Sequence, residues 1–138
     1  MYDTILVTLE ATSTDRAIIE HVKSLAAVMH SRVFLLHVAD GWAARAYGSD
    51  AVSPEVTEDM AYLEKVRNEF LSAGIAAEAE LAYGEPAQEI IRWVETKGCD
   101  LVAMSTHGHR FLGDLLLGTT SRLVRHKVSV PVLLLRAK

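Results

Sequence analysis

Hydrophobic positions along this chain follow two periods in turn. Short apolar runs predict buried strands, and between them apolar residues recur at intervals of three and four, the spacing of one helix face. The runs that predict strands lie at residues 4–9, 32–39, 75–83, 101–105 and 130–135. The segments that predict helices lie at residues 13–30, 54–73, 86–97 and 119–127. This alternation predicts one α/β domain over residues 1–138, with a mostly parallel sheet and helices on both faces.

Boundary residues support these helices. Ser13-Thr14-Asp15 supplies a cap with an acid in the first turn, and Pro54 suits the first position of the second helix. Gly74 and Gly98 each end a helix. The pattern predicts that the second helix buries an apolar stripe made of Val56, Met60, Leu63, Val66 and Phe70.

Composition and charge narrow the class of protein. The formal net charge is −4 and no block of like charges stands out, so the bulk field favours neither nucleic acid nor an anionic membrane. Cys99 is the single cysteine, so an intramolecular disulfide is excluded. We expect Cys99 to be a small, packed side chain. The N-terminus lacks the pattern of a signal peptide, and no apolar run has membrane-spanning length. We expect a soluble, cytoplasmic protein.

The candidate chemistry lies after the predicted strands, because open parallel sheets bind ligands beyond the carboxyl ends of their strands. The fourth strand runs into Ser105-Thr106-His107-Gly108, and nine residues later Gly118-Thr119-Thr120-Ser121 opens a helix. A glycine turn and a hydroxyl-rich helix start can hold a phosphate through free N–H groups and the helix dipole. The connection 40–53 is long for a compact domain and is expected to be functional or mobile.

Other nucleotide, metal and catalytic patterns do not fit. The first strand is not followed by G-x-G-x-x-G, and Asp114 stands where a P-loop needs its lysine. His107 and His109 have no third ligand at a natural spacing, so a metal site is not predicted. No serine lies in a nucleophile elbow, and Glu10 is a single carboxylate at a strand end.

Residues 105–121 resemble the signature of the universal stress protein family, whose nucleotide-binding members carry G-x2-G-x9-G followed by Ser or Thr. The resemblance extends from the first strand to the last. It implies a Rossmann-like domain with strand order 3-2-1-4-5, adenine-nucleotide binding (ATP or AMP), and homodimers. A Mg²⁺ ion could accompany ATP, although no protein ligand for it is evident.

The resemblance also implies a set of binding residues. Gly108 and Gly118 match two of the signature glycines, Val38 matches the residue whose backbone meets the adenine, and Glu10 falls where Asp is usual. The full predicted nucleotide site is Thr8, Glu10, Val38, Ser105, His107, Gly108, His109, Arg110, Gly118, Thr119, Thr120 and Ser121.

Three departures from the family pattern bear on function. Ser105 replaces the first glycine, which adds both a Cβ and a hydroxyl next to the ligand. Glu10 is one methylene longer than the usual Asp, and Thr8 stands where proline is common. Three hypotheses follow: a nucleotide-binding stress-response regulator, a slow ATPase or phosphotransferase, and a nucleotide-free interaction protein of the same fold. We expect a homodimer through 130–135, since an uncovered apolar edge strand invites association.

Overall fold

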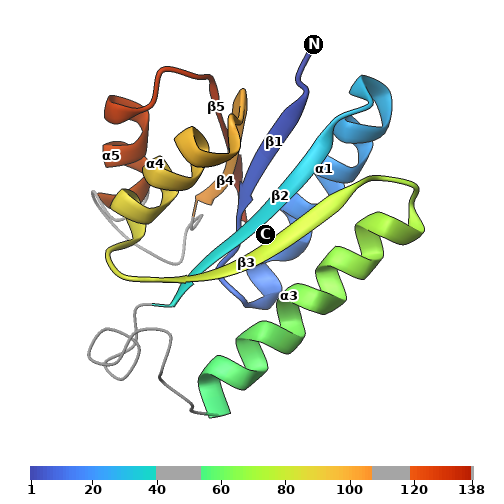
Figure 1. Ribbon diagram of the computed structural model, residues 1–138, viewed down its shortest axis with the longest axis horizontal. Coiled ribbons are helices and arrows are strands. Elements are labelled where there is room, and N and C mark those ends of the chain that lie inside the picture. The colour runs from blue at the N-terminus through green and yellow to red at the C-terminus, as the bar shows by residue number, and fades with distance from the viewer. Residues whose placement is uncertain (40–53, 107–118, 138) are drawn as a thin grey trace.

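The computed structural model describes residues 1–39, 54–106 and 119–137, and in these ranges the chain alternates strands and helices (Figure 1). The strands are β1 (Thr4–Thr8), β2 (Arg32–Ala39), β3 (Ala77–Tyr83), β4 (Leu101–Thr106) and β5 (Val132–Arg136). The helices are a short 3₁₀ turn (Ser13–Asp15), α1 (Arg16–Met29), α3 (Pro54–Ser72), α4 (Pro86–Lys97) and α5 (Thr119–Lys127). The predicted connection 40–53 lies outside the described residues.

The strands form one sheet in the order β3-β2-β1-β4-β5, and every neighbouring pair is parallel. This confirms the α/β class and the strand order that the family resemblance implies. Strand β1 lies at the centre, where Thr8 is paired with Leu36 of β2 and Val7 with Ala103 of β4. Because all five strands run the same way, their carboxyl ends meet at one edge of the sheet.

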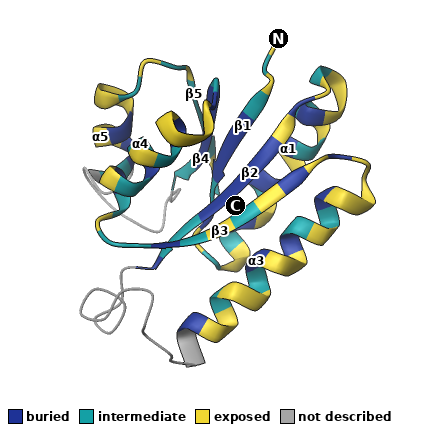
Figure 2. Ribbon diagram, in the orientation of Figure 1, coloured by how far each residue is buried: buried dark blue, intermediate teal, exposed yellow. Residues whose placement is uncertain are grey.

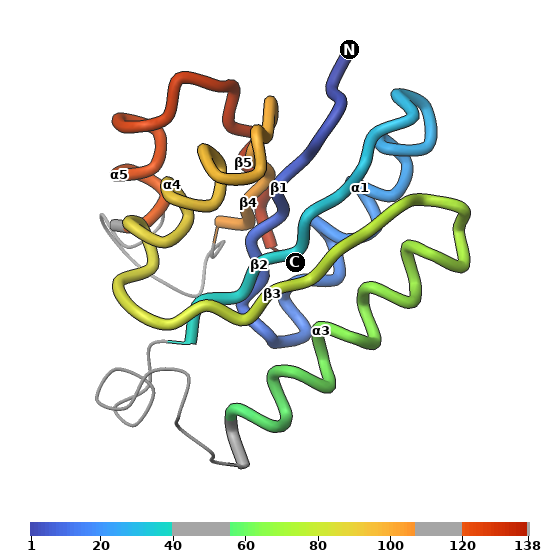
Figure 3. Tube along the Cα trace, in the orientation of Figure 1, coloured from blue at the N-terminus to red at the C-terminus, as the bar shows by residue number. Residues whose placement is uncertain are grey.

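Helices cover both faces of the sheet, as the alternating pattern predicts. Figures 1 and 3 show α1 and α3 on one face and α4 and α5 on the other. The core is divided accordingly: Ile5 and Val7 of β1 pack with the α1 and α3 side chains, and Leu6 packs with those of α4 and α5. A central strand buried on both faces is a continuous apolar run, which is why 4–9 shows no polar alternation.

The buried stripe of α3 differs from the prediction at one position. Met60 is 58% exposed, so its predicted burial is wrong, whereas Val56, Leu63, Val66 and Phe70 are buried. Asp59 takes the inward position instead, and its side chain is only 14% exposed. Residues 56, 59, 63, 66 and 70 follow the 3-4-3-4 spacing of one helix face. Figure 2 shows buried and exposed residues on opposite sides of this helix.

The helix ends follow the expected chemistry, with one difference. The Glu85 carboxylate caps α4 by accepting hydrogen bonds from the N–H groups of Ala87 and Gln88. Gly98 ends α4 with a φ of 62°, a conformation that favours glycine. At the start of the first helical segment, the predicted cap at residues 13–15 is replaced by Thr12, whose hydroxyl caps the 3₁₀ turn before α1, while Asp15 is the predicted acid in the first turn.

Candidate functional site

The predicted ligand site lies where the strand order reverses, at the carboxyl ends of β1 and β4. From β1 the chain leads to β2 on one side, while β4 leads to β5 on the other. Val7 is paired with Ala103, so Thr8 and Ser105 lie one and two residues beyond that pair on neighbouring strands. Val38 lies two residues beyond the Thr8–Leu36 pair. The fold therefore brings three predicted site residues to the same edge.

Ser105 has an unusual hydroxyl for a packed strand end. Its Oγ atom is buried and has no hydrogen-bond partner among the residues that the structure describes. A buried donor and acceptor left unpaired costs on the order of 1–3 kcal/mol. Such an atom at the point where α/β sheets bind ligands offers a polar anchor.

The turn after β1 is held by a buried carboxylate. Asp15 has no exposed surface, and its Oδ1 and Oδ2 accept hydrogen bonds from the backbone N–H groups of Glu10 (2.8 Å) and Ala11 (2.9 Å). Ala11 has a φ of 62°, in the left-handed region that a residue with a Cβ rarely adopts. The two charge-assisted bonds offset the strain. They fix the backbone of Glu10 while its side chain stays exposed.

Helix α3 makes a direct contact with this carboxylate. The Tyr62 hydroxyl donates a hydrogen bond of 2.7 Å to Oδ2 of Asp15. Burial raises the pKa of Tyr62, and the hydrogen bond to the Asp15 carboxylate raises it further. The neutral phenol is thus the form that fits the site.

A second contact joins α3 to the same edge of the sheet. The His37 ring, at the end of β2, places Nδ1 2.7 Å from the backbone carbonyl of Leu9 and Nε2 3.3 Å from Oδ2 of Asp59. Both side chains are only 14% exposed. Neither residue was predicted from the sequence. The 3-4-3-4 spacing of α3 could have indicated Asp59, because it places this carboxylate within the apolar stripe of the helix.

The predicted phosphate-binding residues are described only in part. Helix α5 runs back along the sheet after β4, so its N-terminal end lies toward the carboxyl edge (Figure 1). Thr119 begins this helix, Thr120 is partly buried and Ser121 is buried at 3% exposure. The remaining predicted site residues fall outside the described ranges and are His107, Gly108, His109, Arg110 and Gly118.

Within the described ranges, no group of three or more His, Cys, Asp or Glu side chains is placed to hold a metal ion, and no helix is long and apolar enough to cross a membrane.

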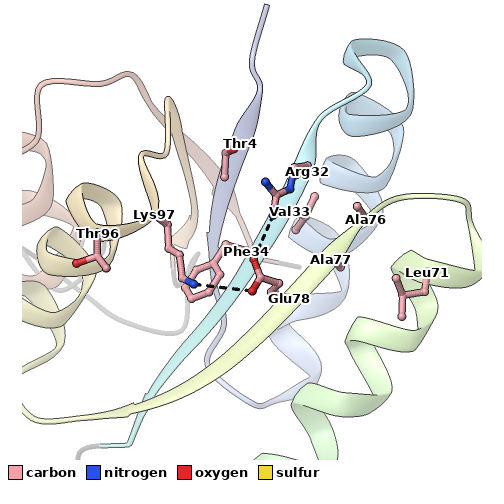
Figure 4. Close-up of a pocket in the computed structure, with 10 residues that line it drawn as sticks. All are labelled: Thr4, Arg32, Val33, Phe34, Leu71, Ala76, Ala77, Glu78, Thr96 and Lys97. Carbon is pink, nitrogen blue, oxygen red and sulfur yellow. Dashed lines mark hydrogen bonds and ion pairs between the residues drawn. The ribbon is translucent and has the colours of Figure 1, made fainter.

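A cavity of about 370 Å³ lies at the opposite, amino end of the strands (Figure 4). There Glu78 forms ion pairs with Arg32 and Lys97, and the Lys97 ammonium lies over the Phe34 ring.

Comparison with known proteins decides the family. A family model described as the universal stress protein family matches residues 1–136. The chain belongs to the universal stress protein family. It is 24% identical over 157 residues to universal stress protein MJ0577 of Methanocaldococcus jannaschii, covering 100% of this chain and 97% of that protein. It is 30% identical over 142 residues to universal stress protein A homolog 2 of Coxiella burnetii, covering 99% and 97%.

Solved structures of the family have the same fold. The structure of MJ0577 matches with a TM-score of 0.83 and 28% identity, covering 100% of this chain and 98% of that one. A universal stress protein in complex with cAMP matches with a TM-score of 0.78 and 16% identity over 99% of both chains. The Archaeoglobus fulgidus protein in complex with dAMP matches with a TM-score of 0.73 and 17% identity, covering 96% and 97%. Some structural relatives in this family therefore bind adenine nucleotides.

Proposed function

We propose that this universal stress protein binds AMP or ATP at the carboxyl edge of β1 and β4 and acts as a stress-response regulator. The observation that carries the proposal is the buried hydroxyl of Ser105, which has no hydrogen-bond partner among the described residues and lies where the strand order reverses. The neighbouring turn is already fixed by Asp15, which lowers the ordering cost of binding. The cAMP and dAMP complexes of structural relatives support an adenine nucleotide as the ligand class.

The proposed roles follow the chemistry of each residue. The N-terminal end of α5 faces the phosphates, with donors from Gly108, Gly118 and the hydroxyls of Thr119, Thr120 and Ser121. His107, His109 and Arg110 add donors or positive charge near the phosphates.

Glu10, Val38 and Thr8 frame the nucleoside. The backbone of Glu10 is held by Asp15, so its longer side chain can adjust to the ribose while the main chain stays fixed. Any Mg²⁺ that accompanies ATP would be held mainly by phosphate oxygens and water, the ligands that this ion usually keeps in nucleotide sites.

Ser105 gives the proposal a residue-level test. If its hydroxyl bonds the nucleotide, Ser105→Ala weakens AMP binding about tenfold, the loss expected for one buried hydrogen bond. Ser72→Ala, at an exposed position that ends α3, is the matched control and leaves the affinity unchanged. Equal affinities in wild type and Ser105→Ala would remove Ser105 from the site.

The two alternative functions are distinguished by the nucleotide that is bound to the purified protein and by the phosphate that it releases from ATP. Mass spectrometry of ligand released from the purified protein identifies a bound adenine nucleotide. Its absence, together with no binding in solution, favours a nucleotide-free interaction protein. Phosphate release from ATP that is lost in Gly118→Val favours a slow ATPase, whereas release that survives this change belongs to a contaminant.

We also propose that the protein is a homodimer through β5. Among the described strands, β5 pairs only with β4 and forms an edge of the sheet, and Val132 to Leu135 are all partly exposed. An apolar edge strand in this condition is stabilised by a partner. Sedimentation should give twice the mass of the chain. Leu134→Arg should give a monomer, whereas Leu123→Arg, at an exposed leucine of α5, should stay dimeric. A wild-type monomer at high protein concentration contradicts the assignment.

A further inference from the structure

The His37 ring lies between three elements that meet beside the proposed nucleotide site. Nδ1 faces the carbonyl oxygen of Leu9, at the end of β1, and Nε2 faces the Asp59 carboxylate on α3. His37 itself precedes Val38 on β2, and Leu9 precedes Glu10. The imidazole thus joins the backbone segments that carry Glu10 and Val38, two of the residues proposed to frame the nucleoside.

The two contacts of His37 have different proton requirements. A carbonyl oxygen only accepts, so Nδ1 must carry a hydrogen to bond Leu9. In the neutral ring Nε2 then has a lone pair, which would face the lone pairs of Asp59 across 3.3 Å. In the imidazolium both nitrogens donate, and both contacts are satisfied at once. The β1 contact therefore exists in either state, whereas the α3 contact requires the second proton.

Among the residues that the structure describes, few competing charges surround His37. On α3 the group in contact is Asp59, and the next carboxylate along, Glu58, is exposed. On β1 the facing group is the Leu9 carbonyl, followed by the exposed Glu10. On β3 the residue paired with His37 is Leu81, which is apolar, and the nearest titratable groups on that strand are Glu80 and Tyr83. The nearby Asp15 carboxylate is already engaged by Tyr62 and two N–H groups.

We propose that His37 is a positioning residue that makes nucleotide binding sensitive to pH: protonation closes its contact with Asp59 and holds Val38 in the binding arrangement. When the proton is lost, α3 keeps its Tyr62–Asp15 contact but loses the one beside Val38. The unprotonated site then samples more conformations. Because these are lost when the nucleotide binds, the affinity for the nucleotide falls. By linkage, nucleotide binding must favour proton uptake at His37. This inference rests on the proposed function.

The test uses three proteins and two kinds of measurement. His37→Asn does not titrate and places an amide donor near the position of Nδ1, so it keeps the Leu9 bond and loses the Asp59 contact. His37→Ala loses both. AMP affinity is measured by calorimetry at a lower and a higher pH, about pH 5.5 and about pH 8. The second ionisation of the phosphate occurs in the same interval but affects all three proteins alike.

At the lower pH we expect the wild type to bind AMP about threefold more tightly than His37→Asn does. The effect is modest because it arises from one partly exposed ion pair. At the higher pH the two proteins should bind equally, and His37→Ala should be weaker at both. Wild-type binding should also take up protons, measured as a dependence of the heat on the ionisation enthalpy of the buffer. An identical pH dependence in wild type and His37→Asn would overturn the proposal.

A ligand-free measurement separates this inference from the proposed function. In ¹⁵N-labelled protein without nucleotide, the backbone amide signals of Val38 and Asp59 should shift together with pH in the wild type and not in His37→Asn. If these amides shift as expected but no nucleotide binds at any pH, the proposed function fails and the proton-dependent contact stands. If the amide of Val38 does not respond, the positioning role of His37 is excluded whether or not AMP binds.

Discussion

The Tyr62 hydroxyl on α3 donates a 2.7 Å hydrogen bond to the fully buried carboxylate of Asp15 at the start of α1. The same carboxylate holds the N–H groups of Glu10 and Ala11, so one buried anion joins a helix to the turn after β1. This arrangement explains how a non-glycine residue with a positive φ is kept at the edge of the proposed site.

Removing the Asp15 carboxylate should be strongly destabilising. Asp15→Ala leaves the N–H groups of Glu10 and Ala11 and the Tyr62 hydroxyl without their acceptor, so the free energy of unfolding should fall by about 3 kcal/mol. Urea denaturation followed by circular dichroism measures the change. Glu95→Ala, at an exposed position of α4, is the control and should lose less than about 0.5 kcal/mol. Equal losses in the two variants would show that Asp15 does not hold the turn.

Tyr62 should make the protein lose stability in alkali. Burial and the Asp15 hydrogen bond raise its pKa in the folded state, so the neutral phenol is the form that the fold favours. This contribution is complete below about pH 10, where an unfolded tyrosine titrates, and is lost as the pH rises above that value. Between about pH 9 and pH 11 the wild type should therefore lose more unfolding free energy than Tyr62→Phe. Parallel pH profiles for the two proteins would contradict this account.

Cys99 should be unreactive while the protein is folded. Burial, with a smaller effect of Asp100, raises the pKa of its thiol to about 11, so very little thiolate is present near neutral pH. A disulfide reagent such as dithionitrobenzoate should react slowly with the native protein and rapidly in urea, releasing one equivalent per chain. Rapid reaction in native buffer would show that the thiol is accessible.

The two faces of α3 should respond differently to substitution. Leu63→Ala empties a buried position and should cost about 2–5 kcal/mol, whereas Met60→Ala, at an exposed position, should change stability by less than about 0.5 kcal/mol. The midpoints of urea unfolding of the two variants measure the difference. A large loss in Met60→Ala would mean that this side chain is covered in solution, by a partner or by the chain itself.

The fold was largely predictable because each element carries its own local signal. The β1 run is apolar throughout because both of its faces are covered, and Gly74 and Gly98 end helices in the left-handed conformation that their type favours. Periodicity predicted a parallel α/β sheet, but the strand order came from the family resemblance. Local patterns do not record which strand lies next to which.

The polar contacts of the site were harder to predict because they depend on groups far apart in the sequence. Asp15 looks like an ordinary acid in the first turn of a helix, and the sequence does not reveal that the turn at Ala11, with its positive φ, brings two backbone N–H groups to the Asp15 carboxylate. Met60, and not Asp59, was predicted to lie in the buried stripe of α3 because apolar residues usually occupy the inner face of a helix. His37, from another strand, reverses that preference by offering Asp59 a partner. The part of the phosphate loop at 107–118 remains a prediction from the sequence.

The most direct test of adenine-nucleotide binding is calorimetric titration of AMP and ATP into the purified, folded protein, with GTP for comparison. We expect saturable binding of an adenine nucleotide, one site per chain, at submillimolar concentrations. We also expect that Gly118→Val abolishes this binding while the circular dichroism spectrum is unchanged. No heat from AMP or ATP at millimolar concentration would contradict the proposal.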